Sequence, residues 1–156
     1  MSSIAEINID DSALPPPTPE IEQERRVAVF DLLEDNSFSI TRADAHPGPY
    51  NVMLAIRDNR LVFDVKAQNG DLAAEIQLSL SPFRQVVKDY FQICESYFEA
   101  VKRLPPAKIE AIDMARRGIH NEGARVLQDR LDEKIALDLD TARRLFTLIC
   151  VLHFGA

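Results

Sequence analysis

Two hairpin signals between Tyr50 and Leu80 constrain this chain more than any other feature. Asp58-Asn59 and Asn69-Gly70 are two-residue turn sequences, and alternating apolar residues flank both of them. Together the turns predict six cross-strand pairs: Ile56–Leu61, Leu54–Phe63, Val52–Val65, Leu61–Leu78, Phe63–Ile76 and Val65–Ala74. A slip of one residue would move all of these side chains to the other face of the sheet. The segment therefore predicts a three-stranded antiparallel meander with one apolar face.

The same register makes Asp64 and Glu75 direct neighbours on the opposite face. Two carboxylates about 5 Å apart at Cβ repel each other, and they can share a proton or a cation. The pair is therefore a weak candidate site. The alternative is a solvated strand face on which Lys66 neutralises the acids.

Thr18-Pro19 and Ser81-Pro82 each resemble a helix start, with a hydroxyl cap followed by proline in the first turn. The first helix is predicted to run to about Asp35 or Asn36. Its second half, Val27 to Leu33, is apolar on most sides, which predicts burial against more than one neighbour. The second helix carries a broad apolar and aromatic stripe: Phe83, Val87, Tyr90, Phe91, Cys94, Tyr97, Phe98, Val101 and Leu104. We expect this stripe to cover the apolar face of the meander.

Pro105-Pro106 ends that helix and opens another, and the new helix is predicted to break between Gly118 and Asn121. Basic residues followed by Gly118 are typical of a helix C-terminus, and Asn121-Glu122 is typical of a new cap. The alternative is one continuous helix that carries two destabilising glycines. A last helix, capped by Asp140, is predicted to be central to the core.

The densest cluster of functional side chains lies across the expected break. Its members are Arg116, Arg117, His120, Asn121 and Arg125. A fresh helix N-terminus offers free N–H groups to an anion, arginines can fork onto phosphate or carboxylate, and a histidine can carry a proton. The simpler interpretation is structural: the first two arginines neutralise a helix end, the asparagine is a cap, and Arg125 pairs with Asp129 or Glu122.

Arg143-Arg144 is a weak indication of an interaction, because the first turn of a helix disfavours cations. Pairing with Asp138 and Asp140, or an acidic partner surface, would explain it.

No catalytic or cofactor signature is present, so catalytic residues stay unknown and enzymatic activity is not favoured. The sequence lacks a phosphate loop, a dinucleotide fingerprint and a Gly-x-Ser-x-Gly elbow. Cys94 and Cys150 lie in apolar helical patterns without metal-ligand spacing, so we expect buried, reduced and inert thiols. His46 and His153 have no visible ligand partners. We expect neither a cofactor nor a metal site.

Charge and hydropathy set the expected partners. The net charge is −7, which disfavours nucleic acid and anionic membranes. Residues 1–80 carry a net of −8 and residues 81–156 a net of +1, so any basic patch lies in the second half. The first residues lack a signal peptide, and the apolar stretch Leu145 to Phe154 is shorter than the ~20 residues of a membrane span. We therefore expect a cytoplasmic protein with an unknown protein partner.

Four stretches of the sequence together carry a resemblance to a known family: ERRVAVFDLLEDNSF, SPFRQVVKDYFQICESYF, IEAIDMARRGIHNEGARVL and DTARRLFTLICVLH. They resemble a family of uncharacterised alphaproteobacterial proteins, and the resemblance covers the chain from Ile4 to His153. It implies a bacterial cytoplasmic origin. It carries over no functional residue.

These patterns predict one α+β domain over residues 1–156. Residues 1–17 form a strand and a proline connector, 18–80 a helix and an antiparallel sheet, and 81–156 a helical layer. The strand at Ile4, with Ala5, Ile7 and Ile9 on one side, and the strand at Phe38 are expected to extend the meander, and four to five helices to cover it. The expected function is that of a non-enzymatic binding or regulatory/interaction protein. We also expect a homodimer. The alternative is a small phosphate- or carboxylate-binding protein or enzyme that uses residues 116–125.

Overall fold

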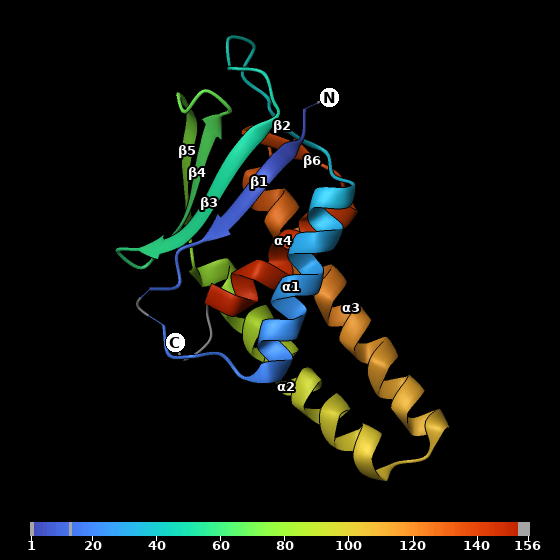
Figure 1. The fold of residues 1–156 in the computed structure, drawn as a ribbon. Helices are drawn as coiled ribbons and strands as arrows, with labels where there is room; N and C mark the ends of the chain where they lie inside the picture. The colour runs from blue at the N-terminus through green and yellow to red at the C-terminus, as the bar shows by residue number, and fades with distance from the viewer. Residues whose placement is uncertain (1, 13, 153–156) are drawn as a thin grey trace.

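The structure is a computed structural model that describes residues 2–12 and 14–152. The fold is α+β, with a four-stranded sheet on one side and the helices on the other (Figure 1). In chain order the elements are β1 (Ile4–Ile9), α1 (Pro19–Glu34), β2 (Phe38–Ile40), β3 (Tyr50–Arg57), β4 (Arg60–Ala67), β5 (Leu72–Ser79), α2 (Ser81–Arg103), α3 (Pro106–Leu131), β6 (Ile135–Leu137) and α4 (Leu139–Leu152).

The meander β3–β4–β5 has the predicted register, and all six predicted pairs are confirmed. Asp58 and Asn59 take the positive φ angles of a two-residue hairpin turn, at 52° and 61°. The second turn is longer than predicted, because the Ala67 N–H donates to the Asp71 carbonyl at 2.8 Å and the register shifts between Val65 and Lys66. Gly70 takes a positive φ of 94° in this turn. Phe63 lies at the centre of the apolar face and is fully buried. Local turn chemistry and alternation therefore agree with the tertiary packing.

Strand β1 extends the sheet, as expected, but it runs parallel to β3, so the sheet is mixed and has the order β1-β3-β4-β5. Parallel neighbours need a long crossover, and the proline connector with α1 provides it. An irregularity between Ile4 and Glu6 interrupts the alternation. The expected inward side was therefore partly wrong, because Ile4 is buried with Ile7 and Ile9 while Ala5 is exposed.

The expectation that the Phe38 strand extends the meander is wrong. Strand β2 instead pairs antiparallel with β6 in a separate two-stranded sheet, in which Phe38 lies opposite Leu137. The backbone N–H of Ser37 donates to the buried Thr141 hydroxyl at 2.9 Å, which ties this small sheet to the start of α4. The partner strand β6 follows β2 at a distance of nearly one hundred residues, so the local sequence pattern around Phe38 could not predict this pairing.

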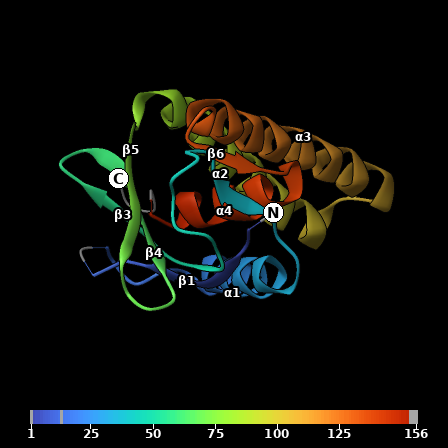
Figure 2. The same ribbon diagram turned by 90° about the horizontal axis from the view of Figure 1, so that it is seen from above.

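Helix α4 is the central element, as predicted, and its residues from Leu145 onward are almost all buried. It lies between α1 and α3 (Figure 2), and both helices pack against it. Its cap is Asp138 and not Asp140, because the Asp138 carboxylate accepts from the Thr141 N–H at 2.9 Å. None of the helices in the described ranges is both long and apolar enough to cross a membrane.

Helix α2 packs chiefly against α3, and the two form an antiparallel hairpin that projects from the body (Figure 1). The expected packing of α2 across the meander is therefore wrong for most of its length. Phe83 and Val87 are buried near its start, whereas Val101 and Leu104 near its end are 53% and 40% exposed.

Helix α3 is continuous, so the predicted break between Gly118 and Asn121 is wrong. Gly123 has a packing role: a Cβ placed there would lie 2.3 Å from the Phe146 ring. The glycine therefore marks the close approach of α3 to α4, and the helical hydrogen bonds pass through it without interruption.

Helix α1 begins as predicted, with the Thr18 hydroxyl accepting from the Ile21 N–H at 3.2 Å. The predicted burial of its second half is wrong. Ala28 and Leu32 face the core, but Val27, Phe30 and Leu33 are 46%, 64% and 42% exposed.

Candidate functional site

The five residues of the predicted anion cluster do not converge. The N–H groups that a break would have freed belong to a continuous helix. Arg125 follows Arg116 by about two and a half helical turns, so it lies on the opposite side of α3 and is exposed. Asn121 is half-buried, and its side-chain oxygen has no hydrogen-bond partner among the described residues.

Arg116 and Arg117 share one carboxylate. Asp113 accepts from Arg116 at 2.6 Å and from Arg117 at 2.9 Å. The Arg116 guanidinium also stacks 4.2 Å from the centre of the Tyr97 ring, which fixes the α2–α3 contact. These two arginines therefore have structural partners.

Asp64 and Glu75 are cross-strand neighbours, as the register requires. Asp64 pairs with Arg57 at 3.2 Å, and Glu75 accepts from Gln77 at 3.0 Å. Arg57 therefore pairs with Asp64 in place of Lys66, whereas Glu75 accepts from an uncharged amide.

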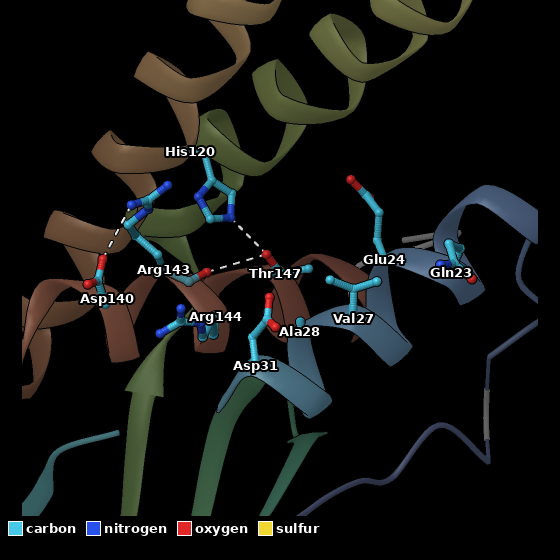
Figure 3. Close-up of a pocket in the computed structure, with 10 residues that line it drawn as sticks. All are labelled: Gln23, Glu24, Val27, Ala28, Asp31, His120, Asp140, Arg143, Arg144 and Thr147. Atoms are coloured by element: carbon cyan, nitrogen blue, oxygen red, sulfur yellow. Dashed lines mark hydrogen bonds and ion pairs between the residues drawn. The ribbon is translucent and has the colours of Figure 1, made fainter. Parts of the chain in front are cut away.

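A cleft of about 340 Å³ lies between α1, α3 and α4 (Figure 3). Its walls contain most of the polar side chains that the three helices turn towards one another. The lining residues are Gln23, Glu24, Val27, Ala28, Asp31, His120, Asp140, Arg143, Arg144 and Thr147. The α1 wall carries the acids Glu24 and Asp31, and the α4 wall carries the two arginines, so the cleft is bipolar.

His120 forms the floor of the cleft together with Thr147. The His120 Nε2 lies 2.7 Å from the Thr147 hydroxyl, and that hydroxyl donates to the Arg143 carbonyl at 3.3 Å. The hydroxyl has one proton, so Nε2–H is the donor in the first contact when that proton is given to the carbonyl, and Nε2 is the acceptor when it is not. Burial lowers the pKa of His120 to about 4, helped by the positive charges of Arg143 and Arg116. The ring is therefore neutral near pH 7.

Glu24 and Tyr90 form a second polar contact at the α1 side. The Tyr90 hydroxyl donates to the Glu24 carboxylate at 3.1 Å, and the tyrosine ring packs 5.2 Å from the His120 ring. Burial raises the pKa of Glu24, and burial with the nearby Glu24 charge raises the pKa of Tyr90. The tyrosine is therefore a permanent donor at neutral pH.

Arg143 and Arg144 are the cations of the cleft. Arg143 pairs with Asp140 at 3.3 Å, but its Nε is buried and has no hydrogen-bond partner among the described residues. Arg144 makes no ion pair within residues 2–12 and 14–152. A buried unpaired donor is costly. Because α4 begins at Leu139 and not after Asp140, both arginines lie in its second turn, where the dipole acts more weakly than in the predicted first turn. The predicted pairing with Asp140 thus accounts for Arg143 only in part.

The His120–Thr147 contact has the distance of a base and a nucleophile, but its chemistry does not suit nucleophilic catalysis. A general base works best with a pKa near the ambient pH, and that of His120 is far lower. The Thr147 hydroxyl also contacts the Arg143 carbonyl, and no carboxylate contacts the other ring nitrogen in the described hydrogen bonds. The arrangement suits binding better than bond cleavage.

Both cysteines are buried and free, as predicted. Burial raises the pKa of Cys94 to about 11, with the Glu24 charge adding to the effect, and burial raises that of Cys150 well above its usual value. No group of three metal-binding side chains occurs in the part of the chain that the structure describes. His46 contributes only its carbonyl, to the Tyr50 hydroxyl, and His153 lies outside the described residues.

A second, larger groove of about 1150 Å³ separates α1 from α2. Ile21, Phe91 and Phe98 make its surface largely apolar, and Glu24 belongs to the walls of both cavities. Its lining also carries charged residues of both signs.

Comparison with known proteins gives the family of this chain. The model described as "Uncharacterised protein family (UPF0262)" matches residues 1–155. The chain belongs to the UPF0262 family. UPF0262 proteins of Roseobacter denitrificans and Dinoroseobacter shibae are 71% and 70% identical to it, each over at least 99% of both chains. One from Paracoccus denitrificans is 70% identical over 97% of this chain and 96% of its own. No solved structure was found to match.

The bacterial family resemblance seen in the sequence is thereby confirmed, and the family has no established activity. The sequence analysis of this UPF0262 protein singled out His120, Arg143 and Arg144, but it did not predict that they lie in one cleft. It missed Glu24, Asp31 and Thr147. The one available signal was the pair of arginines in an unfavourable helical position.

Proposed function

We propose that this UPF0262 protein is a non-enzymatic binding or regulatory protein whose ligand is a small acid held in the α1–α3–α4 cleft. The carboxylate or phosphate of the ligand would contact Arg143 and Arg144. The observation that carries the proposal is the buried Arg143 Nε, which has no hydrogen-bond partner in the described part of the chain and lies beside Arg144, for which that part supplies no counter-ion.

The charges near His120 favour an anion at that end of the cleft. Burial lowers the pKa of His120, and the positive charges of Arg143 and Arg116 lower it further, so both guanidinium groups act on the space around the ring. An anion there would satisfy the arginine N–H groups with charge-assisted hydrogen bonds.

The opposite wall limits which acids fit. Glu24 and Asp31 would repel a polyanion, whereas an amino or hydroxyl group would meet acceptors there. The cleft volume is at the low end for ligand pockets, which favours a small molecule. We therefore expect a bipolar acid, of which an α-amino acid is the simplest type.

Titration monitored by amide NMR tests this function. L-amino acids, dicarboxylic acids and inorganic phosphate are added in turn, and the backbone amide signals of His120 and Thr147 are followed. At least one amino acid should shift both signals in a saturable way, and Arg144→Gln should remove the shift. This substitution breaks no ion pair among the described residues, so it leaves no carboxylate without its partner. Arg125→Gln is the matched control, because that arginine is exposed on the far side of α3.

Two results would contradict the proposal. One is that no compound of the three classes shifts either signal. The other is that Arg125→Gln weakens binding while Arg144→Gln does not. If binding is found, mass spectrometry of metabolites that co-purify with the wild type but not with Arg144→Gln would identify the natural ligand.

A further inference from the structure

The outer face of α1 is an exposed apolar surface in the middle of a charged helix. Val27, Phe30 and Leu33 are 46%, 64% and 42% exposed. Figure 2 shows α1 at one side of the molecule, with α4 and β1 on its inner side. Nothing among the described residues covers the outer side. An exposed cluster of this kind commonly marks an interaction site.

The three residues are arranged symmetrically. Val27 precedes Phe30 by three positions and Leu33 follows it by three, so Phe30 is the centre of the surface. Arg26 precedes Phe30 by four positions and Glu34 follows it by four, and both are exposed. The surface therefore has an apolar middle, a basic end and an acidic end.

We propose that this face binds the same face of a second copy of the chain, with the two α1 helices antiparallel about a two-fold axis through Phe30. Such an interface is isologous, because each copy offers the same self-complementary patch. Phe30 meets Phe30 of the partner subunit, and Val27 lies level with Leu33 of the partner subunit.

Charge decides between the two possible directions. In the antiparallel pair Arg26 lies level with Glu34 of the partner subunit, and the match occurs twice. In a parallel pair Arg26 would lie level with Arg26 of the partner subunit, and the two Glu34 carboxylates would also repel. The patch is neutral overall, so it escapes the repulsion that the net charge of −7 sets up elsewhere between two copies.

The interface also adjoins the cleft. Val27 belongs both to the exposed surface and to the cleft wall, so a second copy would lie at the cleft rim and narrow its opening. One helix face supplies less than the roughly 800 Å² per partner of a standard interface, so the dimer should be weak and concentration-dependent. This inference does not depend on the proposed ligand.

Sedimentation equilibrium of the full chain over a range of concentrations tests the dimer. The wild type should pass from monomer to dimer, and Phe30→Glu should stay monomeric. Met114→Glu is the matched control, since Met114 is 65% exposed on α3 and its replacement should leave the dimer intact. Thermal unfolding of each variant checks that Phe30→Glu is folded.

Charge exchange tests the direction. Arg26→Glu and Glu34→Arg should each weaken the dimer by about tenfold or more, and the double variant should restore it. The proposal is overturned if the wild type stays monomeric at the highest soluble concentration, or if Met114→Glu dissociates the dimer while Phe30→Glu does not. Single variants that leave the dissociation constant unchanged would overturn the antiparallel arrangement.

Discussion

Gly123 shows how one residue decides the path of a helix. The glycine pair at 118 and 123 predicts a break when only local preference is considered, but the two positions differ in their surroundings. A Cβ at Gly123 would meet the fully buried Phe146 ring at 2.3 Å, whereas a Cβ at Gly118 would meet nothing within 4 Å. One glycine permits close helix packing, and the other only weakens an exposed turn.

The two glycines therefore predict opposite effects of alanine. Gly118→Ala should raise the free energy of unfolding by about 0.5–1 kcal/mol, because alanine favours the helix and restricts the unfolded chain. Gly123→Ala should lower it by about 1–3 kcal/mol through overpacking. Urea denaturation of both variants measures the difference. Equal destabilisation by both would mean that the helix is broken near Gly118 after all.

The cysteines give a second prediction at this scale. Cys94 and Cys150 are 5% and 3% exposed, and their pKa values are raised, so little thiolate is present or accessible near pH 7. A thiol reagent should label neither residue in the native protein, and both should react after denaturation. Rapid labelling without denaturant would be the contrary result.

Among the elements, the meander is the part that the sequence specifies most completely. Turn chemistry and alternation act between residues close in the chain, so each hairpin register could be predicted. Phe63 lies at the centre of this register and is fully buried. Phe63→Ala should lower the free energy of unfolding by about 3–5 kcal/mol.

Leu72 in β5 provides the control for that measurement. It is 55% exposed, so Leu72→Ala should change the free energy of unfolding by less than about 0.5 kcal/mol. A comparable loss in both variants would argue against the register and against burial of the meander face.

Elements that meet over long sequence separations were not predictable in the same way. The parallel pairing of β1 depends on a crossover, β2 finds its partner in β6, and α2 packs on α3 in place of the sheet. In each case the apolar pattern predicted, fully or in large part, which side of the element is buried. It contained no information about which apolar surface would cover that side.

At the scale of the whole molecule, the cleft exists only because α1, α3 and α4 converge. Glu24, His120 and Thr147 come from three distant parts of the chain, and none of them stands in a recognisable motif. The arginines of α4 were noticeable because they conflict with a local electrostatic rule. The rest of the cleft follows from packing between distant segments, which explains why the sequence did not predict it.

This convergence ties the global stability to the protonation of His120. Its pKa is about 4 in the folded protein, against an ordinary value of 6.5. Between these values the unfolded chain binds a proton that the folded chain excludes, so the free energy of unfolding falls as the pH falls. Glu24 acts in the opposite direction, because its raised pKa makes the folded state bind a proton more readily than the unfolded state.

Comparison with His120→Gln separates the two effects, since Glu24 is common to both proteins and glutamine can still donate to Thr147. The stability of the wild type relative to this variant should fall by about 2 kcal/mol between about pH 7 and pH 4.5. Urea denaturation at several pH values gives the difference, and NMR titration of the His120 ring locates its pKa directly. Parallel stability profiles, or a ring that titrates near 6.5, would show that His120 is not held neutral by the helices that enclose it.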